Sequence, residues 1–153
     1  MFDTLISNQD RHNENWGSVI TLKGVKHLAP SYDHRASLAR NVNDVEKNSR
    51  MTSKDKGQQL PQFVLKAKSL FQDPSSTNQS KWLKLLDAFK QYAGYEKIAA
   101  KSWLNILKGI SDDDIKAIID KVPMHLMTNT SKDFTYKLIL CNKSNLLELD
   151  DQI

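Results

Sequence analysis

Apolar residues recur every three to four positions through the second half of the chain, which is the spacing of one helix face. The pattern predicts four helices, over residues 80–92, 95–108, 111–122 and 131–149. The side chains expected to face the core are Trp82, Leu85, Leu86, Phe89, Ile98, Ala99, Trp103, Ile106, Leu107, Ile115, Ile118, Ile119, Val122, Phe134, Leu138, Cys141 and Leu149. No internal repeat is evident, and the tryptophans are interpreted as core residues.

Glycine, proline and short polar residues predict the ends of these helices. Ser80 is expected to cap the first helix, and Gly94 and Gly109 to end the first and second. Ser111, followed three residues later by Asp114, is typical of a capping box. The triple-Asp run over residues 112–114 adds negative charge that favours a helix N-terminus. Because consecutive helical residues point in different directions, capping is preferred to metal binding for this run.

The first 38 residues are predicted to contain a short helical segment followed by a β-hairpin. Phe2, Leu5 and Ile6 have helical spacing and predict the last turns of a helix. Residues 16–22 are rich in β-branched and aromatic side chains and predict a strand, with the turn at Lys23-Gly24. The predicted fold class is therefore mainly α with a small β-hairpin, that is, α+β.

Residues 39–79 are the least regular part of the chain. Proline, serine and asparagine cluster at 72–78 and indicate a loop, while residues 62–71 favour a short helix that returns to the core. We expect one domain over residues 1–153, made of a hairpin region (1–38), an irregular basic segment (39–79) and a helical part (80–150).

Composition sets wider limits. The 153 residues are 39% hydrophobic and 26% charged, which suits one soluble domain. A single cysteine excludes an internal disulfide, no apolar stretch reaches the ~20 residues that span a bilayer, and the first 15 residues lack a signal core. We therefore expect a cytoplasmic protein without membrane contact. The net charge of +4 is too weak a signal to predict nucleic-acid binding.

Three polar residues around the hairpin suggest phosphoryl transfer. Asp10 is a candidate base for a substrate hydroxyl, and Asn15 and Asp33 offer oxygen ligands for Mg²⁺ beside ATP. The hairpin brings Asp33 back towards Asn15. The alternative is a polar loop between a helix and a strand, which such residues form without any catalysis.

The sequence motifs of this region resemble those of a known family. Residues 8–15, with Asn8-Gln9-Asp10-Arg11-His12 and Asn15, and residues 28–33, Leu-Ala-Pro-Ser-Tyr-Asp, look like the catalytic and metal-binding segments of HipA-like serine/threonine kinases, the toxin kinases of bacterial toxin–antitoxin pairs. Phosphoinositide-kinase-like enzymes share a D-R-H-x-x-N loop, but their second Asp usually opens a D-F-G triplet, whereas His34-Arg35 follows Asp33 here. The resemblance covers residues 2–38 and is thin afterwards.

The resemblance implies roles for named residues. Asp10 would be the catalytic base, Asn15 and Asp33 would bind Mg²⁺, and His12, Asn15 and Asp33 would contact ATP. The implied fold is the C-terminal lobe of a protein-kinase-like enzyme. From the residues themselves, His12 is expected to brace the loop that holds Asp10, and Arg11 to pair with a nearby carboxylate or backbone carbonyl.

One departure from the family pattern qualifies this function. Residues 1–9 are too short for the lobe that holds ATP, and no G-x-G-x-x-G or G-K-[ST] run appears later. We expect a natural truncation, a kinase split between two polypeptides, or a deliberately shortened chain, inactive without its N-terminal lobe and with an exposed apolar surface where that lobe would pack. The expected partners are that lobe, a protein substrate and an antitoxin. The alternative is a non-enzymatic remnant or antitoxin-binding module.

Two further sets of residues leave alternatives open. The basic side chains after Asp33 are expected to contact phosphate or an acidic substrate, or to lie on a solvated loop: Arg35, Arg40, Lys47, Arg50, Lys54 and Lys56. The histidines suggest zinc or nuclease chemistry only weakly, because none has the spacing of a preorganised metal site: His12, His27, His34 and His125.

Overall fold

A computed structural model describes residues 1–73 and 81–153. The helices are α1 (Phe2–Leu5), α2 (Asp44–Thr52), α3 (Leu60–Leu65), α4 (Leu85–Tyr95), α5 (Lys97–Gly109), α6 (Asp112–Asp120) and α7 (Asn129–Leu147), with short 3₁₀ helices η1 (Asn13–Asn15) and η2 (Asp150–Gln152). The strands are β1 (Ser18–Ile20), β2 (Lys26–Leu28), β3 (Lys68–Gln72) and β4 (Trp82–Lys84). The mainly helical prediction with a small hairpin is confirmed, with a second small antiparallel sheet added.

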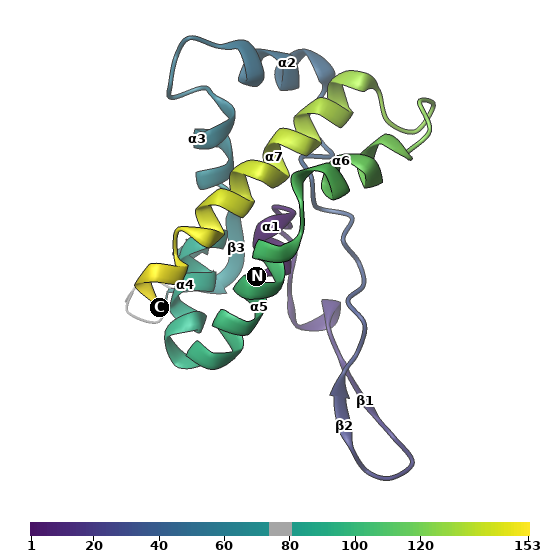
Figure 1. The fold of residues 1–153 in the computed structure, drawn as a ribbon, viewed down its shortest axis with the longest axis vertical. Helices are drawn as coiled ribbons and strands as arrows, with labels where there is room; N and C mark the ends of the chain where they lie inside the picture. Colours follow the sequence, from purple (N-terminus) through teal and green to yellow (C-terminus); the bar gives the residue numbers. More distant parts are fainter. Residues whose placement is uncertain (74–80) are drawn as a thin grey trace.

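Helix α7 is the central element of the fold. It runs diagonally through Figure 1 and packs against α1, α2, α3, α5 and α6. Near its beginning, Phe134 and Leu138 form a core cluster with Leu60 and Val64 of α3. Near its end, Leu146 packs with Leu104 and Leu107 of α5. A helix that buries side chains at both ends and on several sides organises the whole core.

The hairpin projects away from this core (Figure 1). Strands β1 and β2 pair antiparallel with Ser18 opposite Leu28, and every residue of both strands is exposed. Gly24 occupies the left-handed region at φ 76°, which the turn requires and glycine adopts without strain. The predicted strand and its turn at Lys23-Gly24 are therefore confirmed.

The beginning and end of the predicted helix over residues 80–92 were wrong. Ser80 lies outside the described residues, and Trp82 belongs to β4, where it pairs with Gln72 of β3. Pairing between distant segments overrides the local helical spacing here. Helix α4 starts at Leu85 and continues through Gly94 to Tyr95, because the backbone leaves the helical region only at Glu96.

The region predicted to be irregular contains regular elements. Asn43 caps α2 by accepting a hydrogen bond from the Glu46 amide, and Gln59 precedes α3. The short helix expected over residues 62–71 ends at Leu65, and the chain continues into β3. The capping box of α6 is confirmed, because the Ser111 hydroxyl accepts a hydrogen bond from the Asp114 amide at 3.0 Å.

Several apolar residues predicted to be buried are exposed. On α5 the buried side chains are Ala100, Leu104 and Leu107, whereas Ile98, Trp103 and Ile106 face outward. Apolar residues lie on two faces of this helix, so the periodicity alone does not select the face that packs. The other residues wrongly predicted as core are Trp16, Trp82, Ala99 and Ile118.

No helix within residues 1–73 and 81–153 combines the length and apolar character needed to cross a membrane.

The two faces of α5 give a direct test of this packing. Leu104→Ala should lower the free energy of unfolding by about 2–5 kcal/mol, because Leu104 is fully buried and its truncation leaves a cavity. Ile106→Ala on the same helix should cost far less, because the side chain is 55% exposed. Urea denaturation of both variants measures the difference, and equal losses would contradict the assigned face.

Candidate functional site

The segment between α1 and β1 forms a compact polar loop around one buried asparagine. Asn8 is fully buried, and its amide donates to the Asp3 carboxylate at 2.8 Å. The Asn8 side-chain oxygen accepts a hydrogen bond from the Asp10 backbone N–H at 3.3 Å. Asn15 closes the loop by donating from its side-chain amide to the Asp10 carbonyl at 2.6 Å. These bonds place Asp10 and Asn15 side by side.

Arg11 joins three segments at one point. Its guanidinium binds both oxygens of the Asp3 carboxylate, at 2.9 to 3.1 Å. It also donates to the backbone carbonyls of Asn15 and Tyr32 and contacts His34 Nδ1 at 3.0 Å. A planar, multiply donating guanidinium suits such a junction, which a lysine ammonium would not reproduce. The prediction that Arg11 pairs with a carboxylate or a backbone carbonyl is confirmed for both.

Asp33 is brought to this loop through the residues on either side of it. Tyr32 and His34 both contact Arg11, and the Tyr32 hydroxyl donates to the Glu14 carbonyl at 2.8 Å. Asp33 itself lies in the left-handed region at φ 52°. Aspartate tolerates this conformation better than most residues, and such backbone positions cluster at functional sites. The loop and the segment after the hairpin therefore meet beside Asp10 and Asn15.

The carboxylates of Asp10 and Asp33 are available for a ligand, whereas Asn15 is buried, with only 5% of it exposed. Within the residues that the structure describes, the carboxylates of Asp10 and Asp33 accept no hydrogen bond and form no ion pair, and both residues are exposed. The Asn15 side-chain nitrogen donates to the Asp10 carbonyl, and no hydrogen bond to the Asn15 side-chain oxygen forms within the described residues. Asn15 and Asp33 carry side-chain oxygens of the kind that Mg²⁺ prefers as ligands, and their assignment to a metal stays a prediction.

His12 lies within the loop as a cap. Its Nδ1 accepts a hydrogen bond from the Glu14 amide at 3.2 Å and so begins η1. This contact confirms that His12 braces the loop. Its assignment to the nucleotide remains a prediction. No group of three or more histidine, cysteine or acidic side chains in the described parts of the chain is arranged to hold a metal ion.

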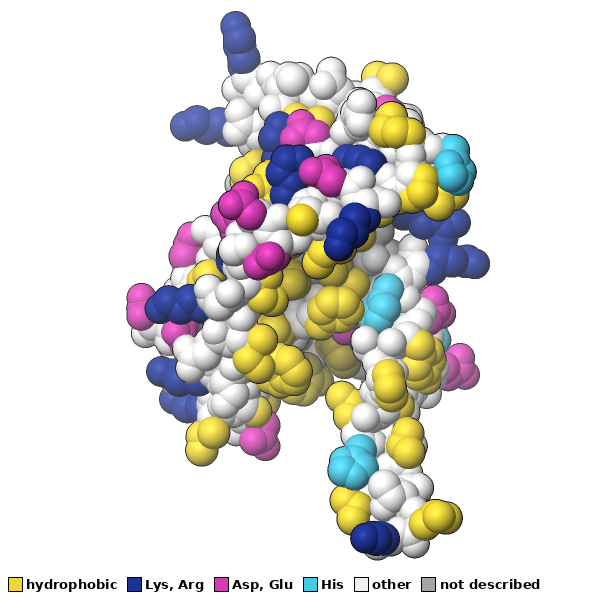
Figure 2. All heavy atoms as spheres, turned by 45° about the vertical axis from the view of Figure 1, so that its right-hand side comes forward, with side chains coloured by type: hydrophobic (Ala, Val, Ile, Leu, Met, Phe, Trp, Pro, Cys, Tyr) yellow, Lys and Arg dark blue, Asp and Glu magenta, His cyan; other side chains and the backbone are white. Residues whose placement is uncertain are grey.

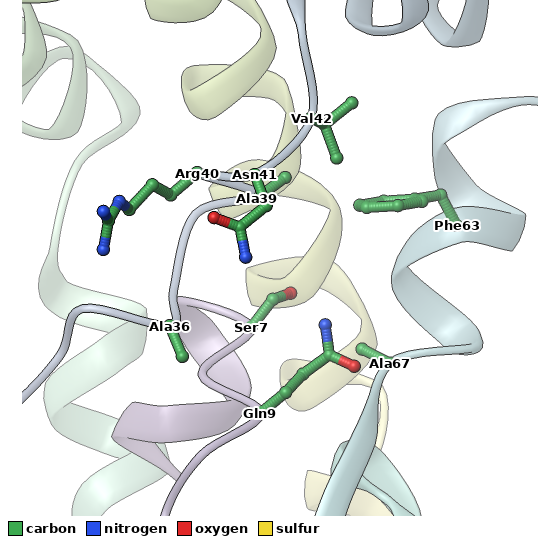
Figure 3. A pocket seen from close by; sticks show the side chains of 9 residues that line it. All are labelled: Ser7, Gln9, Ala36, Ala39, Arg40, Asn41, Val42, Phe63 and Ala67. Carbon is green, nitrogen blue, oxygen red and sulfur yellow. The ribbon is translucent and has the colours of Figure 1, made fainter.

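The loop is fastened to the helical body at its base. Asn142 of α7 donates to the Leu5 carbonyl at 3.0 Å and to the Ser7 hydroxyl at 2.8 Å. The Leu38 amide donates to the Ile6 carbonyl at 2.8 Å. A cavity of about 170 Å³ lies beside this junction, and Figure 3 shows Ser7 and Gln9 facing Ala67 across it. The candidate site therefore rests on the central helix.

An apolar hollow lies between the hairpin and the helical body (Figure 2). The exposed apolar side chains of these elements include Val19, Ile20 and Leu28 on the hairpin, Phe2 on α1, and Trp103, Ile106 and Ile110 on or just after α5. Exposed apolar surface of this extent marks an interaction site. Exposed apolar side chains are therefore present on these elements, and their role as the surface where a second lobe packs stays a prediction.

Sequence reasoning missed three residues that position this site. Asp3 and Asn142 have no local signal, because their partners lie on other elements. Asn8 is part of the motif that resembles the kinase family, but the sequence assigned it no role. Its burial between two aspartates shows that it shapes the loop.

Comparison with solved structures gives the fold its context. The chain is similar to a protein described as "A Helicobacter pylori proinflammatory kinase CtkA", with a TM-score of 0.75 and 25% sequence identity. The chain has a kinase-like fold. The similarity covers 98% of this chain and 51% of the kinase, so the chain spans about half the length of that protein. No protein-family model matches the sequence, and no curated protein matches it.

The ion pair between Asp3 and Arg11 makes stability depend on pH. Burial raises the pKa of Asp3, but hydrogen bonds from Arg11 and Asn8 and the Arg11 charge lower it, and the net pKa is below its usual value. A lowered pKa contributes stability above the unfolded-state pKa of about 3.9, and this contribution is lost as the pH falls through the folded-state pKa.

Asp3→Asn should therefore lower the free energy of unfolding at neutral pH by about 1–3 kcal/mol. The difference from the wild type should shrink as the pH falls below about 4, because Asp3 of the unfolded chain then takes up a proton that the folded carboxylate binds only at lower pH. Urea denaturation across pH measures it. Asp87→Asn, which removes an exposed carboxylate of α4, serves as the control. A wild-type advantage that is constant down to about pH 3 would exclude the ion pair as its source.

Proposed function

We propose that these residues form the catalytic lobe of a HipA-like serine/threonine protein kinase, which transfers the γ-phosphate of ATP to a protein hydroxyl. The observation that carries the proposal is the Arg11 junction. It brings the loop of Asp10 and Asn15 against the segment of Asp33 within a kinase-like fold. The order Asp10, Asn15, Asp33 is also the one that the family resemblance implies.

Asp10 is the proposed base. Its backbone is fixed by hydrogen bonds to Asn8 and Asn15, while its carboxylate is exposed and has no partner in the described parts of the chain. A positioned carboxylate of this kind accepts the proton of the attacking hydroxyl. Because the backbone is fixed and the carboxylate is free, the Asp10 carboxylate can contact a substrate while the loop keeps its conformation.

Asn15 and Asp33 are the proposed holders of Mg²⁺. The Asn15 amide is committed to the Asp10 carbonyl, so its oxygen faces away from that bond. Asp33 offers a carboxylate from a segment that Arg11 holds beside the loop. Two protein oxygens fit Mg²⁺, which takes its remaining ligands from water and phosphate. When bound, the ion neutralises negative charge on the phosphates of ATP.

Phosphotransfer also requires a lobe that holds ATP, and the proposal places that lobe against the apolar hollow. The hairpin and α5, on either side of the hollow, carry large exposed apolar side chains such as Ile20, Trp103 and Ile106. A second lobe on the same or another polypeptide would bury them. His12, beside Asn15, is proposed to lie on the nucleotide side of the loop.

The same hollow supports a second candidate function. A chain that presents this surface to a partner, without transferring phosphate, is a non-enzymatic binding module, and an antitoxin is one such partner. Calorimetry with ATP and Mg²⁺, carried out with the second lobe present, separates the two functions. A kinase should bind the nucleotide and lose that binding when the Asp33 carboxylate is removed. A binding module should show no nucleotide binding that depends on Asp33.

Replacing Asp10 tests the kinase proposal. The chain is produced together with the polypeptide encoded immediately upstream and incubated with radiolabelled ATP, Mg²⁺ and a protein substrate pool. Asp10→Asn should lower the phosphotransfer rate by about 10²–10⁴-fold, because the base is lost while the loop's backbone contacts remain. Asp87→Asn removes one carboxylate far along the sequence and should leave the rate unchanged. Full activity in Asp10→Asn would refute the assignment.

A further inference from the structure

A second cavity, of about 400 Å³, opens between the segment that follows Asp33 and the beginning of α7. Three basic side chains line it: Arg35, Arg40 and Lys47. Its volume lies within the range of ~300–1,000 Å³ that is typical of ligand sites. Neither the proposed catalytic loop nor the apolar hollow accounts for this concentration of positive charge.

Lys47 is the least expected of these residues, because it is buried. Only 5% of it is exposed, and its Nζ donates to the Ser131 hydroxyl at 2.9 Å and lies 5.9 Å from the centre of the Phe134 ring. No carboxylate within residues 1–73 or 81–153 reaches it at ion-pair distance. The charge of Lys47 helps to lower the pKa of Asp44, so that carboxylate offsets part of the cost of burying the ammonium group, and an anion in the cavity would offset more of it.

Arg35 and Arg40 add charge at the opening. Both are exposed, and neither side chain forms an ion pair or hydrogen bond in the part of the chain that the structure describes. Figure 3 shows the Arg40 side chain extending away from Val42 and Phe63, so its guanidinium does not fill the smaller cavity there. Guanidinium groups without a protein partner are suited to forked, charge-assisted hydrogen bonds to a phosphate.

The N-terminus of α7 reinforces this charge. Thr128 caps the helix by accepting a hydrogen bond from the Ser131 amide at 3.1 Å, and both residues line the cavity. The 19-residue helix directs its positive dipole end here.

One carboxylate opposes these positive groups. Asp44 accepts hydrogen bonds from the Thr128 and Ser131 hydroxyls, each at 2.7 Å, and these bonds lower its pKa. The Ser131 hydroxyl thus accepts a hydrogen bond from Lys47 and donates one to Asp44. The Asp44 carboxylate orients the hydroxyls of both Thr128 and Ser131. Three cationic side chains against one carboxylate leave an excess of positive charge that a dianion would neutralise.

We propose that this cavity binds the phosphoryl group of a phosphorylated serine or threonine within a protein segment. A doubly charged phosphoryl group suits the charge excess better than a single carboxylate. The cavity is larger than one phosphate needs, and Leu126 and Met127 give it an apolar wall that would contact the carbon atoms of a peptide. The proposal concerns binding alone and does not depend on phosphotransfer by Asp10.

Peptide binding tests the proposal. The probes are a fluorescein-labelled phosphoserine peptide pool with randomised flanking positions and the same pool without phosphate, measured by fluorescence polarisation. The wild type should bind the phosphorylated pool and not the other. Arg35→Gln/Arg40→Gln should weaken this binding by about tenfold or more, because two charge-assisted contacts are lost. Unlabelled inorganic phosphate should compete only weakly.

A charge-matched control separates the cavity from general basicity. Lys54→Gln/Lys56→Gln also removes two positive charges, from exposed residues that do not line the cavity. It should change binding by less than about twofold, in the range of ordinary surface substitutions. An equal loss in both double variants, equal binding of the two pools, or no binding would overturn the proposal. Competition by inorganic phosphate as strong as by the phosphopeptide would overturn its assignment to a protein segment.

Discussion

The contact between Arg11 and Asp3 is the constraint on which the candidate site depends. Arg11 is almost fully buried and uses its guanidinium on one carboxylate, two backbone carbonyls and a histidine. Charged hydrogen bonds of this kind each contribute about 1.5–3 kcal/mol. Their main effect here is geometric, because they fix the start of α1, the Asp10–Asn15 loop and the segment of Asp33 against one another. The bond from the Tyr32 hydroxyl to the Glu14 carbonyl adds to this attachment between the loop and the segment after the hairpin.

The central helix turns this local junction into part of the fold. Asn142 of α7 holds the end of α1, while Phe134 and Leu146 bury the two halves of the core. The same helix presents its N-terminus to the basic cavity. One element therefore supports the proposed catalytic loop at one point and the proposed phosphoryl site at another, and His34, which contacts Arg11 and lines the cavity, joins the two.

Local signals in the sequence predicted local structure well. The turn at Gly24 and the cap at Ser111 depend on neighbouring residues, and both are present. The pairing of β3 with β4, the exposed face of Trp103 and the burial of Lys47 depend on segments far apart in the chain, so no local pattern reveals them. The candidate residues Asp10, Asn15 and Asp33 were found from their types and order. The residues that hold them in place, Asp3 and Asn142, were not, because their role exists only in the folded chain.

Paramagnetic broadening by Mn²⁺, used in place of Mg²⁺, tests the central claim that the Arg11 junction assembles a metal site from two loops. In a two-dimensional NMR titration of the chain, the amide signals of Asn15 and Asp33 should broaden first, and Asp33→Asn should abolish the effect at both. The run Asp112–Asp114 provides an internal comparison, because it is acidic but forms the first turn of α6. Broadening at that run with none at Asn15 and Asp33 would contradict the account.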